Sequence, residues 1–302
     1  MASGKYLDPK ADLTFKKVFG EHPELVMSLL NALLPLDEGK QIEHVEYLPA
    51  EMVPENPGKK NSIVDVRCRE TGGRHFIVEM QMNWNHEFEQ RVILNASKAI
   101  IKQLDTNEDY KLLQPVYALN LINDVGFQAA PDEFYHDYAI VNVAHTDRII
   151  EGLRFVFVEL PKFKPQTIKE KKMAVLWLRF LTEINKGTRE APKELLENPD
   201  TKKALRILEK SAYTEGELYA YERYWDYVNY ERGIVEGGYY KGLAEGVAKG
   251  HAEGLAEGHA EGMEKGEAKA NRENARKMKA LGVDDKVICQ VTGLTEEEVS
   301  ML

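Results

Sequence analysis

Apolar positions in the first half of the chain follow helix spacing in some stretches and strand spacing in others. Residues 12–34 predict two short amphipathic helices, and residues 41–48 alternate weakly, as an edge strand would. Residues 62–70 and 74–82 are rich in β-branched side chains and predict two strands around a glycine turn. Further segments predict a loop, a helix and three strands at residues 51–60, 87–104, 116–122, 138–143 and 153–160. Strands and helices in this order predict an α/β fold with a mixed sheet flanked by helices.

From residue 167 onward the pattern predicts helices. Residues 167–185 and 200–230 carry apolar side chains at helix spacing. The second segment is rich in tyrosine, and we interpret its aromatic side chains as a packing surface rather than a platform for unpaired bases. The C-terminal part of the protein is therefore expected to be α-helical.

Glycine occupies every fourth position from Gly238 to Gly266, separated mainly by Ala, Glu, Lys and His. Four residues turn an α-helix by about 400°, so the glycine row drifts by about 40° per step and forms no straight contact stripe. Each glycine also costs about 1 kcal/mol relative to alanine inside a helix. Two interpretations stay open, a helix packed closely against another copy and a flexible spacer.

The last 30 residues predict a small helical module. Gly282 is expected to end a helix, Asp284 to begin the next, and residues 295–298 have capping-box spacing for a third. A helix that opens with three glutamates would be repelled by phosphates, so a protein-contact module is favoured over a DNA-reading one.

The predicted hairpin contains two acids, Asp65 and Glu79, at positions where half-buried strands usually carry apolar residues. If the turn is centred on Gly72, Asp65 faces Glu79 and Ile63 faces Gln81. Opposed residues have Cβ atoms roughly 4.5–5.5 Å apart, so two carboxylates would repel unless a cation lay between them. A hard divalent cation explains the pair, whereas a two-residue turn would send the acids to opposite faces. Taken singly, Asp65 could cap a turn or pair with an arginine, and Glu79 could be a surface residue.

The same residues carry a family resemblance. Asp65, followed on the next strand by Glu79, Met80 and Gln81, resembles the core of the PD-(D/E)XK nucleases, in the variant with Gln at the usual Lys position. The chain is similar in particular to the Rpn type, the recombination-promoting nucleases or transposases. The similarity covers most of residues 5–187, and the matching segments are 7–20, 29–34, 110–116, 157–163 and 177–181, with Arg91 opening a helix. One departure is residues 94–99, where relatives tend to carry tyrosines.

This resemblance implies a restriction-endonuclease-like fold and metal-dependent hydrolysis of phosphodiester bonds. Asp65 and Glu79 would hold Mg²⁺, which Mn²⁺ is expected to replace, and the backbone carbonyl of Met80 would be a further ligand. Gln81 can position a water by hydrogen bonding but carries no charge, so reduced rather than absent activity is expected. Asp12 and Lys16 are weaker candidates for a further acid and a phosphate contact, with an N-cap and a solvated lysine as the structural alternative.

Composition restricts the possible functions further. The chain has 302 residues, a net charge of −10 and two cysteines that lie far apart, and no segment has a basic surplus. This balance argues against tight non-specific DNA binding by one subunit, although a bound cation would neutralise part of an acidic site. No long apolar run, P-loop, GxGxxG or HExxH motif is present. We therefore expect a cytoplasmic, reduced protein with no membrane contact.

The sequence as a whole predicts four parts. They are a nuclease-like core, a helical extension packed on it, the glycine repeat and a small helical module, over residues 1–165, 166–232, 233–270 and 271–302. The expected function is that of a Mg²⁺-dependent DNA endonuclease that forms a homo-oligomer through its C-terminal helical region. The alternative is a catalytically weak or inactive nuclease-fold protein that acts as an oligomeric DNA-associated or regulatory module.

Overall fold

The computed structural model describes residues 4–52, 62–85, 87–165 and 172–302. The chain forms two compact units, Met1–Arg232 and Gly233–Leu302. Most of the predicted loop at 51–60 and the start of the helix predicted from 167 lie outside the described residues. The finer four-part division of the chain stays a prediction.

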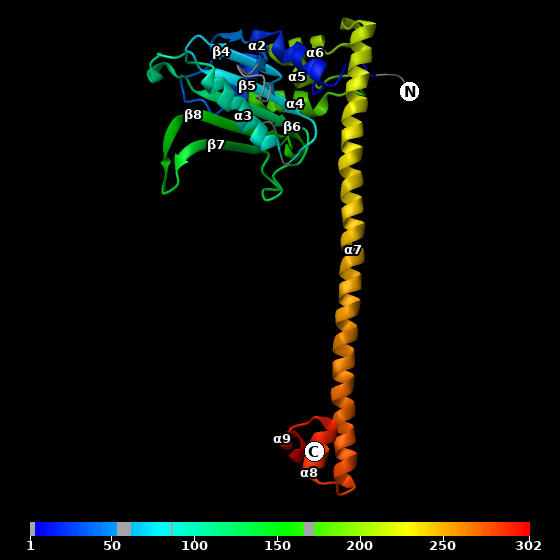
Figure 1. The fold of residues 1–302 in the computed structure, drawn as a ribbon. Coiled ribbons are helices and arrows are strands. Elements are labelled where there is room, and N and C mark those ends of the chain that lie inside the picture. The colour runs from blue at the N-terminus through cyan, green and yellow to red at the C-terminus, as the bar shows by residue number, and fades with distance from the viewer. Residues whose placement is uncertain (1–3, 53–61, 86, 166–171) are drawn as a thin grey trace. The chain divides into compact units, whose positions relative to one another are not determined.

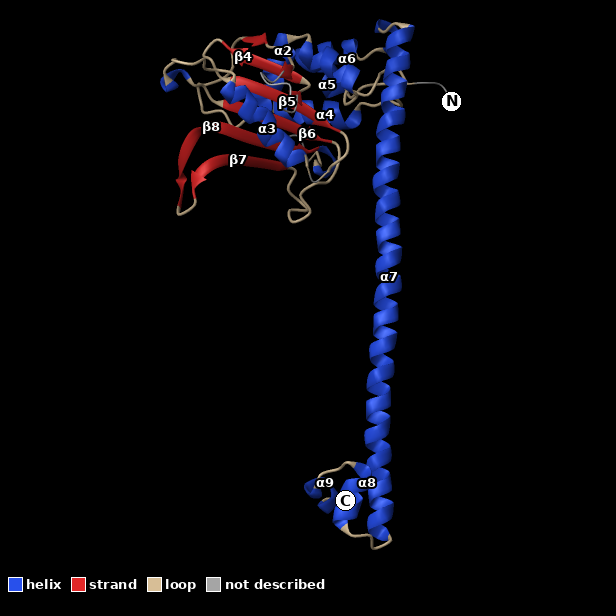
Figure 2. Ribbon diagram, in the orientation of Figure 1, coloured by secondary structure: helices blue, strands red, loops and turns tan. Residues whose placement is uncertain are grey.

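The first unit is built on a six-stranded mixed sheet (Figure 2). The strand order is β1-β4-β5-β6-β8-β7; β5, β6 and β8 run parallel, and the other neighbours pair antiparallel. The strands are β1 (Val45–Tyr47), β4 (Val66–Glu70), β5 (His75–Gln81), β6 (Val116–Ile122), β7 (Tyr135–Asn142) and β8 (His145–Glu159). The predicted edge strand and the strand at 116–122 are confirmed.

Helices cover both faces of this sheet (Figure 1). One face packs against α1 (Asp12–Phe15), the π-helical turn η1 (Lys16–Gly20), α2 (Pro23–Leu33), α4 (Met173–Glu183), α5 (Lys193–Glu197) and α6 (Pro199–Ile207). Its core includes Phe19 and Trp177, which meet edge to face with ring centroids 5.3 Å apart. The other face packs against α3 (Phe88–Ile101), close to the predicted helix. The predicted α/β fold with a mixed sheet and flanking helices is therefore confirmed.

The hairpin of β4 and β5 has the predicted register. Val66 pairs with Val78 and Cys68 with Phe76, so the pairs are symmetric about Gly72. Gly73 has a φ of +95°, a left-handed conformation that favours glycine and suits a three-residue hairpin loop. Glycine at this position therefore fixes a pairing whose last pair, Val66 with Val78, lies next to Asp65 and Glu79.

The first predicted strand of the hairpin is shorter than expected, and the pairing of Ile63 with Gln81 was wrong. Ile63 belongs to β3 (Ser62–Ile63), which pairs with β2 (Glu51–Met52) in a separate two-stranded sheet. The break has a local cause, because the Asp65 carboxylate accepts a hydrogen bond from the backbone N–H of Met80 at 2.7 Å. An aspartate side chain that binds backbone in this way competes with the strand ladder.

The predicted helix at 200–230 is interrupted after α6 by the 3₁₀ turn η4 (Lys210–Ala212). A second helix, α7 (Glu215–Ala280), follows and begins in the first unit. There the hydroxyl of Tyr221 accepts a hydrogen bond from the backbone N–H of Asp8 at 3.0 Å. Tyr213 and Tyr221 are buried, as a packing role predicts, whereas Tyr219, Tyr227 and Tyr230 are exposed.

The second unit is helical throughout the repeat, and a side-chain atom added at any of the eight glycines from Gly238 to Gly266 would meet nothing within 4 Å. After α7 come α8 (Asp285–Thr292) and α9 (Glu296–Ser300), around the buried side chains of Ala275, Ile288 and Val299. The Thr295 capping box, the helix start at Asp284 and the end of a helix at Gly282 are confirmed, and Gly282 has a left-handed conformation. No helix among the described residues is long and apolar enough to cross a membrane.

Candidate active site

Asp65 and Glu79 lie where β4 begins and β5 nears its end. The Asp65 Oδ2 atom is 2.7 Å from the Met80 backbone nitrogen, so the carboxylate sits against the residue that follows Glu79. Gln81 closes β5, level with Ile122 of β6 and Glu159 of β8. The group therefore lies at the carboxyl ends of the parallel strands, where open α/β sheets bind their ligands.

Burial makes Asp65 a weak acid in the metal-free protein. Its removal from solvent raises the pKa of the carboxyl to about 7, against the opposing effect of the Met80 N–H, and the charge of Glu79 raises it further. Such a carboxyl holds its proton until a cation or a rise in pH removes it. The environment of Asp65 therefore favours a bound cation at neutral pH.

Glu79 is 6% exposed, and its pKa is raised by burial. Two groups on α3 oppose this effect. The Nδ2 of Asn95 donates a hydrogen bond to Glu79 Oε1 at 2.7 Å, and the nearest guanidinium nitrogen of Arg91 is 3.8 Å from Oε2. Asn95 therefore fixes the orientation of the carboxylate, and Arg91 supplies the nearby positive charge.

Gln81 is engaged at both ends of its amide group. Its Oε1 accepts a hydrogen bond from Arg91, and its Nε2 donates to the backbone carbonyl of Asn83. The guanidinium of Arg91, which is 44% exposed, therefore brings a positive charge next to the amide of Gln81. Helix α3 positions this charge, because Arg91 and Asn95 are one turn apart and project from the same side of the helix.

Asp12 and Lys16 form an i,i+4 ion pair with a distance of 2.5 Å between Asp12 Oδ1 and Lys16 Nζ. Both side chains are close to half exposed. The pair lies near the acids, since the charge of Lys16 lowers the pKa of Asp65 and that of Asp12 raises it. Asp12 is the first residue of α1 rather than its N-cap, which is Ala11.

The side chains present fit a cation that needs few protein ligands. Among the residues described, no group of three or more His, Cys, Asp or Glu side chains could hold a metal. Mg²⁺ is commonly held by one or two carboxylates and keeps several waters or substrate oxygens. The buried Oδ1 atoms of Asn95 and Asn120 have no hydrogen-bond partner, and Asn120 pairs with Glu79 across β5 and β6. Buried acceptors beside the acids suit the water shell of such an ion.

The start of α7 lies beside the acids. Burial and the charge of Asp65 raise the pKa of the Tyr224 hydroxyl. The Nδ2 of Asn83 is 3.4 Å from both the Val228 carbonyl and Glu231 Oε2. The helix that follows the predicted core therefore contributes to the surroundings of the site.

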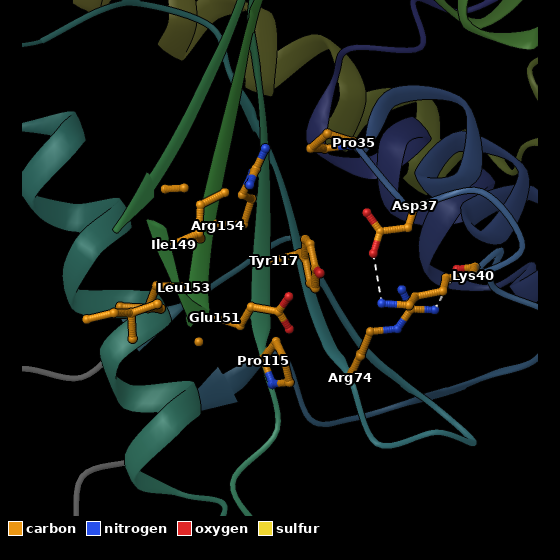
Figure 3. A pocket seen from close by; sticks show the side chains of 13 residues that line it. Pro35, Asp37, Lys40, Arg74, Pro115, Tyr117, Ile149, Glu151, Leu153 and Arg154 are labelled. Carbon is orange, nitrogen blue, oxygen red and sulfur yellow. Dashed lines mark hydrogen bonds and ion pairs between the residues drawn. The ribbon is translucent and has the colours of Figure 1, made fainter. Parts of the chain in front are cut away.

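A cavity at the opposite end of the parallel strands does not share this chemistry. It holds about 160 Å³ and is lined by residues that include Arg74, Tyr117 and Arg154 (Figure 3). Its cations are already paired with acids: Lys40 with Asp37 at 2.8 Å, Arg154 with Asp137, and Arg74 with Glu70. This cavity is therefore not a candidate for phosphate chemistry.

The sequence interpretation missed Asn95, Asn83 and Tyr224 as neighbours of the acids. Asn95 lies in the segment that departs from the family pattern, so its position offered no motif. The signal that could have found it is an asparagine at an apolar-face position of α3, between the buried residues Val92 and Ala99. Nothing in the local sequence of Tyr224 indicated that α7 would approach the site.

Comparison with known proteins agrees with this fold. A family model described as PD-(D/E)XK nuclease family transposase matches residues 9–235. Searches of curated proteins and of solved structures gave no significant match. The matched range covers the whole sheet, the helices on both faces and the start of α7. The chain therefore belongs to the PD-(D/E)XK nuclease family of transposases.

Proposed function

We propose that this nuclease-family protein is a metal-dependent DNA endonuclease that hydrolyses phosphodiester bonds. The observation that carries the proposal is the meeting of Asp65 with the Glu79–Met80 segment, with both carboxyl pKa values raised by burial. Two acids removed from solvent at the end of a sheet have a high energy unless they are protonated or share a cation. A divalent cation meets that requirement at neutral pH.

Asp65 and Glu79 would hold Mg²⁺ or Mn²⁺, with the Met80 backbone carbonyl as a further ligand. When bound, such an ion lowers the pKa of a coordinated water and stabilises negative charge on the phosphate. Asn95 holds Glu79 in one orientation through its hydrogen bond. Gln81 and Arg91 together place a polar amide and a positive charge beside Glu79, where they can orient the water and the phosphate. Lys16 would contact the phosphate, with Asp12 as its partner.

The test of this function is nicking of supercoiled plasmid DNA by the purified full-length protein with Mg²⁺ or Mn²⁺. Asp65→Ala and Glu79→Ala should each lower the nicking rate by at least about 10²-fold, because each removes charge stabilisation of several kcal/mol. Asp137 lies on β7 and is paired with Arg154 of β8, so Asp137→Ala removes an acid elsewhere in the sheet and should leave the nicking rate unchanged. Equal nicking by the wild type and Asp65→Ala would show that this site does not catalyse the reaction.

One observation favours a second candidate function, a weak or inactive nuclease fold that acts as a DNA-associated or regulatory module. Each end of the Gln81 amide already makes one hydrogen bond, which leaves one lone pair and one N–H for a water, and the side chain carries no charge to stabilise the phosphate. Absence of nicking by the wild type, together with DNA binding, would support this second candidate.

Arg91 distinguishes these two functions. If its guanidinium replaces the missing lysine charge, Arg91→Met should lower the nicking rate about 10²-fold, as loss of one preorganised charge does. The affinity for Mn²⁺, measured by titration calorimetry, should stay equal or rise because a cation near Glu79 is gone. Arg148→Met, an exposed arginine at the tip of the β7–β8 hairpin, is the matched control.

The double variant Gln81→Lys/Arg91→Met should recover part of the lost rate, since it returns the charge to the position the family usually uses. Unchanged nicking in Arg91→Met would mean that the guanidinium plays no part in the reaction.

We also propose that DNA is the substrate and that the protein assembles with its own copies through the C-terminal helical region. The net charge of the chain is −10, so a single subunit attracts the phosphates of DNA only weakly, and an assembly of several subunits would add up their contacts. Along α7 the apolar side chains Val247, Leu255 and Met263 are more than half exposed, which suits a helix that packs against another helix.

A further inference from the structure

Arg67 is the most unusual charged residue of the sheet. It lies on β4, two residues after Asp65, and is 8% exposed. Its Nε has no hydrogen-bond partner, and no acid or acceptor among the described residues pairs with its guanidinium. Arginine is almost never this buried unless it is paired, because an isolated buried charge is strongly unfavourable. The position therefore lacks an anion.

A second unpartnered polar group lies next to it. Arg67 pairs with Ile77, and His75 stands two residues before Ile77 on β5. Diagonal neighbours on one face are about 7–8 Å apart at Cα, within reach of long side chains. His75 is 6% exposed, and its Nδ1 has no partner. Two buried nitrogen atoms therefore lie on one face of the hairpin without a hydrogen-bond partner for either.

The other arginines of the sheet show that this is not a general feature of the fold. Arg69, on the same face of the same strand and opposite His75, is paired with Glu46. Arg74 is paired with Glu70 and Arg154 with Asp137. Since Arg69, Arg74 and Arg154 each have an acid, the partner that buried Arg67 lacks is assigned to a ligand.

We propose that Arg67 and His75 form a phosphate-binding subsite beside the catalytic acids, which holds a backbone phosphate of the DNA strand next to the phosphate that is cleaved. The subsite rests on the proposed function and extends it. Strand alternation puts Arg67, His75 and Glu79 on the same face of the hairpin. Arg67 is two residue steps from Asp65, about 6.6 Å along the strand direction, so the ligand lies beside the reacting phosphate rather than at it.

The chemistry of both side chains suits a phosphate. A guanidinium presents planar, charged donors that match two phosphate oxygens at once, and it stays protonated even when buried. A ring N–H of His75 can donate to a third oxygen. Binding would give the guanidinium the counter-charge that the described residues do not provide.

Inorganic phosphate is the first probe, with the full-length protein kept metal-free in EDTA so that the acids do not contribute. Phosphate should raise the Tm of the wild type, because a ligand that binds only the folded state stabilises it. Arg67→Met should have a higher Tm than the wild type in phosphate-free buffer and should not respond to phosphate. Arg148→Met, which changes an exposed arginine near the tip of the β7–β8 hairpin, is the control and should respond as the wild type does.

A purely structural role of Arg67 predicts the opposite result. Arg67→Met would then be less stable than the wild type in both buffers, and that outcome overturns the proposal. Arg67→Lys keeps the charge, so it should retain part of the phosphate response even if the methionine variant folds poorly. A wild-type Tm that does not change with phosphate also overturns the proposal.

A DNA oligonucleotide is the second probe and identifies the source of the phosphate. In EDTA, the slope of log affinity against log salt concentration should become shallower by about one in Arg67→Met and stay unchanged in Arg148→Met. Loss of the inorganic phosphate response without a change in this slope would show that the ligand is free phosphate, which overturns the DNA assignment. A phosphate response in a protein that nicks no plasmid would leave the subsite in place and reject the endonuclease function.

Discussion

Replacing Asp65 by Asn should stabilise the metal-free protein at pH 8 while abolishing metal-dependent nicking. The pKa of Asp65 is raised by burial to about 7. A folded-state pKa above the unfolded value means that the folded state keeps its proton longer, so stability is lost as pH rises from about 4 to about 7. A shift from 3.8 to about 7 corresponds to at most about 4 kcal/mol, and an uncharged asparagine avoids this loss.

The free energy of unfolding in urea, followed by tryptophan fluorescence, measures this effect. All three tryptophans lie in the first unit, so the signal reports on that unit alone. In EDTA at pH 8, Asp65→Asn should exceed the wild type by about 2–4 kcal/mol, and the difference should shrink toward pH 5. Asp137→Asn is the matched control and should show no such pH-dependent gain.

Adding Mg²⁺ should reverse the order of stability. The ion binds only the folded wild type, which gains stability by mass action, whereas Asp65→Asn gains little. Lower stability of Asp65→Asn at pH 8 in EDTA would show that the carboxylate is ionised and satisfied without a metal. The same result would remove the physical basis for a cation at this site.

The local sequence was sufficient to predict the β4–β5 hairpin. Glycines at 72 and 73 leave few choices of turn, and the β-branched residues on either side favour strands. Register then follows from the turn, so the expectation that residues 65 and 79 face each other could be made without tertiary information. The same reasoning failed for Ile63, because it treated Asp65 as an ordinary strand residue. Its carboxylate instead binds the Met80 N–H and ends the ladder.

The surroundings of the acids could not be predicted in the same way. Arg91, Asn95 and Tyr224 reach the site from α3 and α7, and their approach depends on how these helices pack on the sheet. Such contacts join residues far apart in sequence, so no spacing rule reveals them. The sequence also offered no reason to single out Arg67, which occupies an ordinary strand position. Its burial becomes informative only when the structure shows that its Nε has no hydrogen-bond partner.

Replacing the repeat glycines by alanine should have the second large effect. In α7 a Cβ added at Gly242, Gly246, Gly250, Gly254 or Gly258 meets nothing within 4 Å. Each substitution should therefore stabilise the helix by about 1 kcal/mol, so that the five together give roughly 5 kcal/mol. Amide hydrogen exchange across residues 240–260 should slow accordingly, and helicity measured by circular dichroism should persist to a higher temperature.

The mass of the protein in solution then separates the two interpretations of the repeat. If the glycines allow close contact with another copy, added methyl groups would block the approach, and light scattering should show a smaller assembly for the alanine variant. If the repeat is a spacer, the mass stays constant while helicity increases. The reverse substitution, glycine for Ala244, Ala248, Ala252 and Ala256, should lower helicity in either case and serves as the control for composition.

These measurements also test why a helix with so many glycines exists at all. The described residues of the second unit give the repeat no tertiary contact that would offset the helix-breaking tendency of its glycines, and its apolar side chains are exposed. A helix of this composition gains the missing stability by packing against another helix, where glycine allows close approach of the backbones. We therefore expect the alanine variant to be more helical and less assembled than the wild type. A variant with unchanged mass and faster exchange across residues 240–260 would contradict both parts of this expectation.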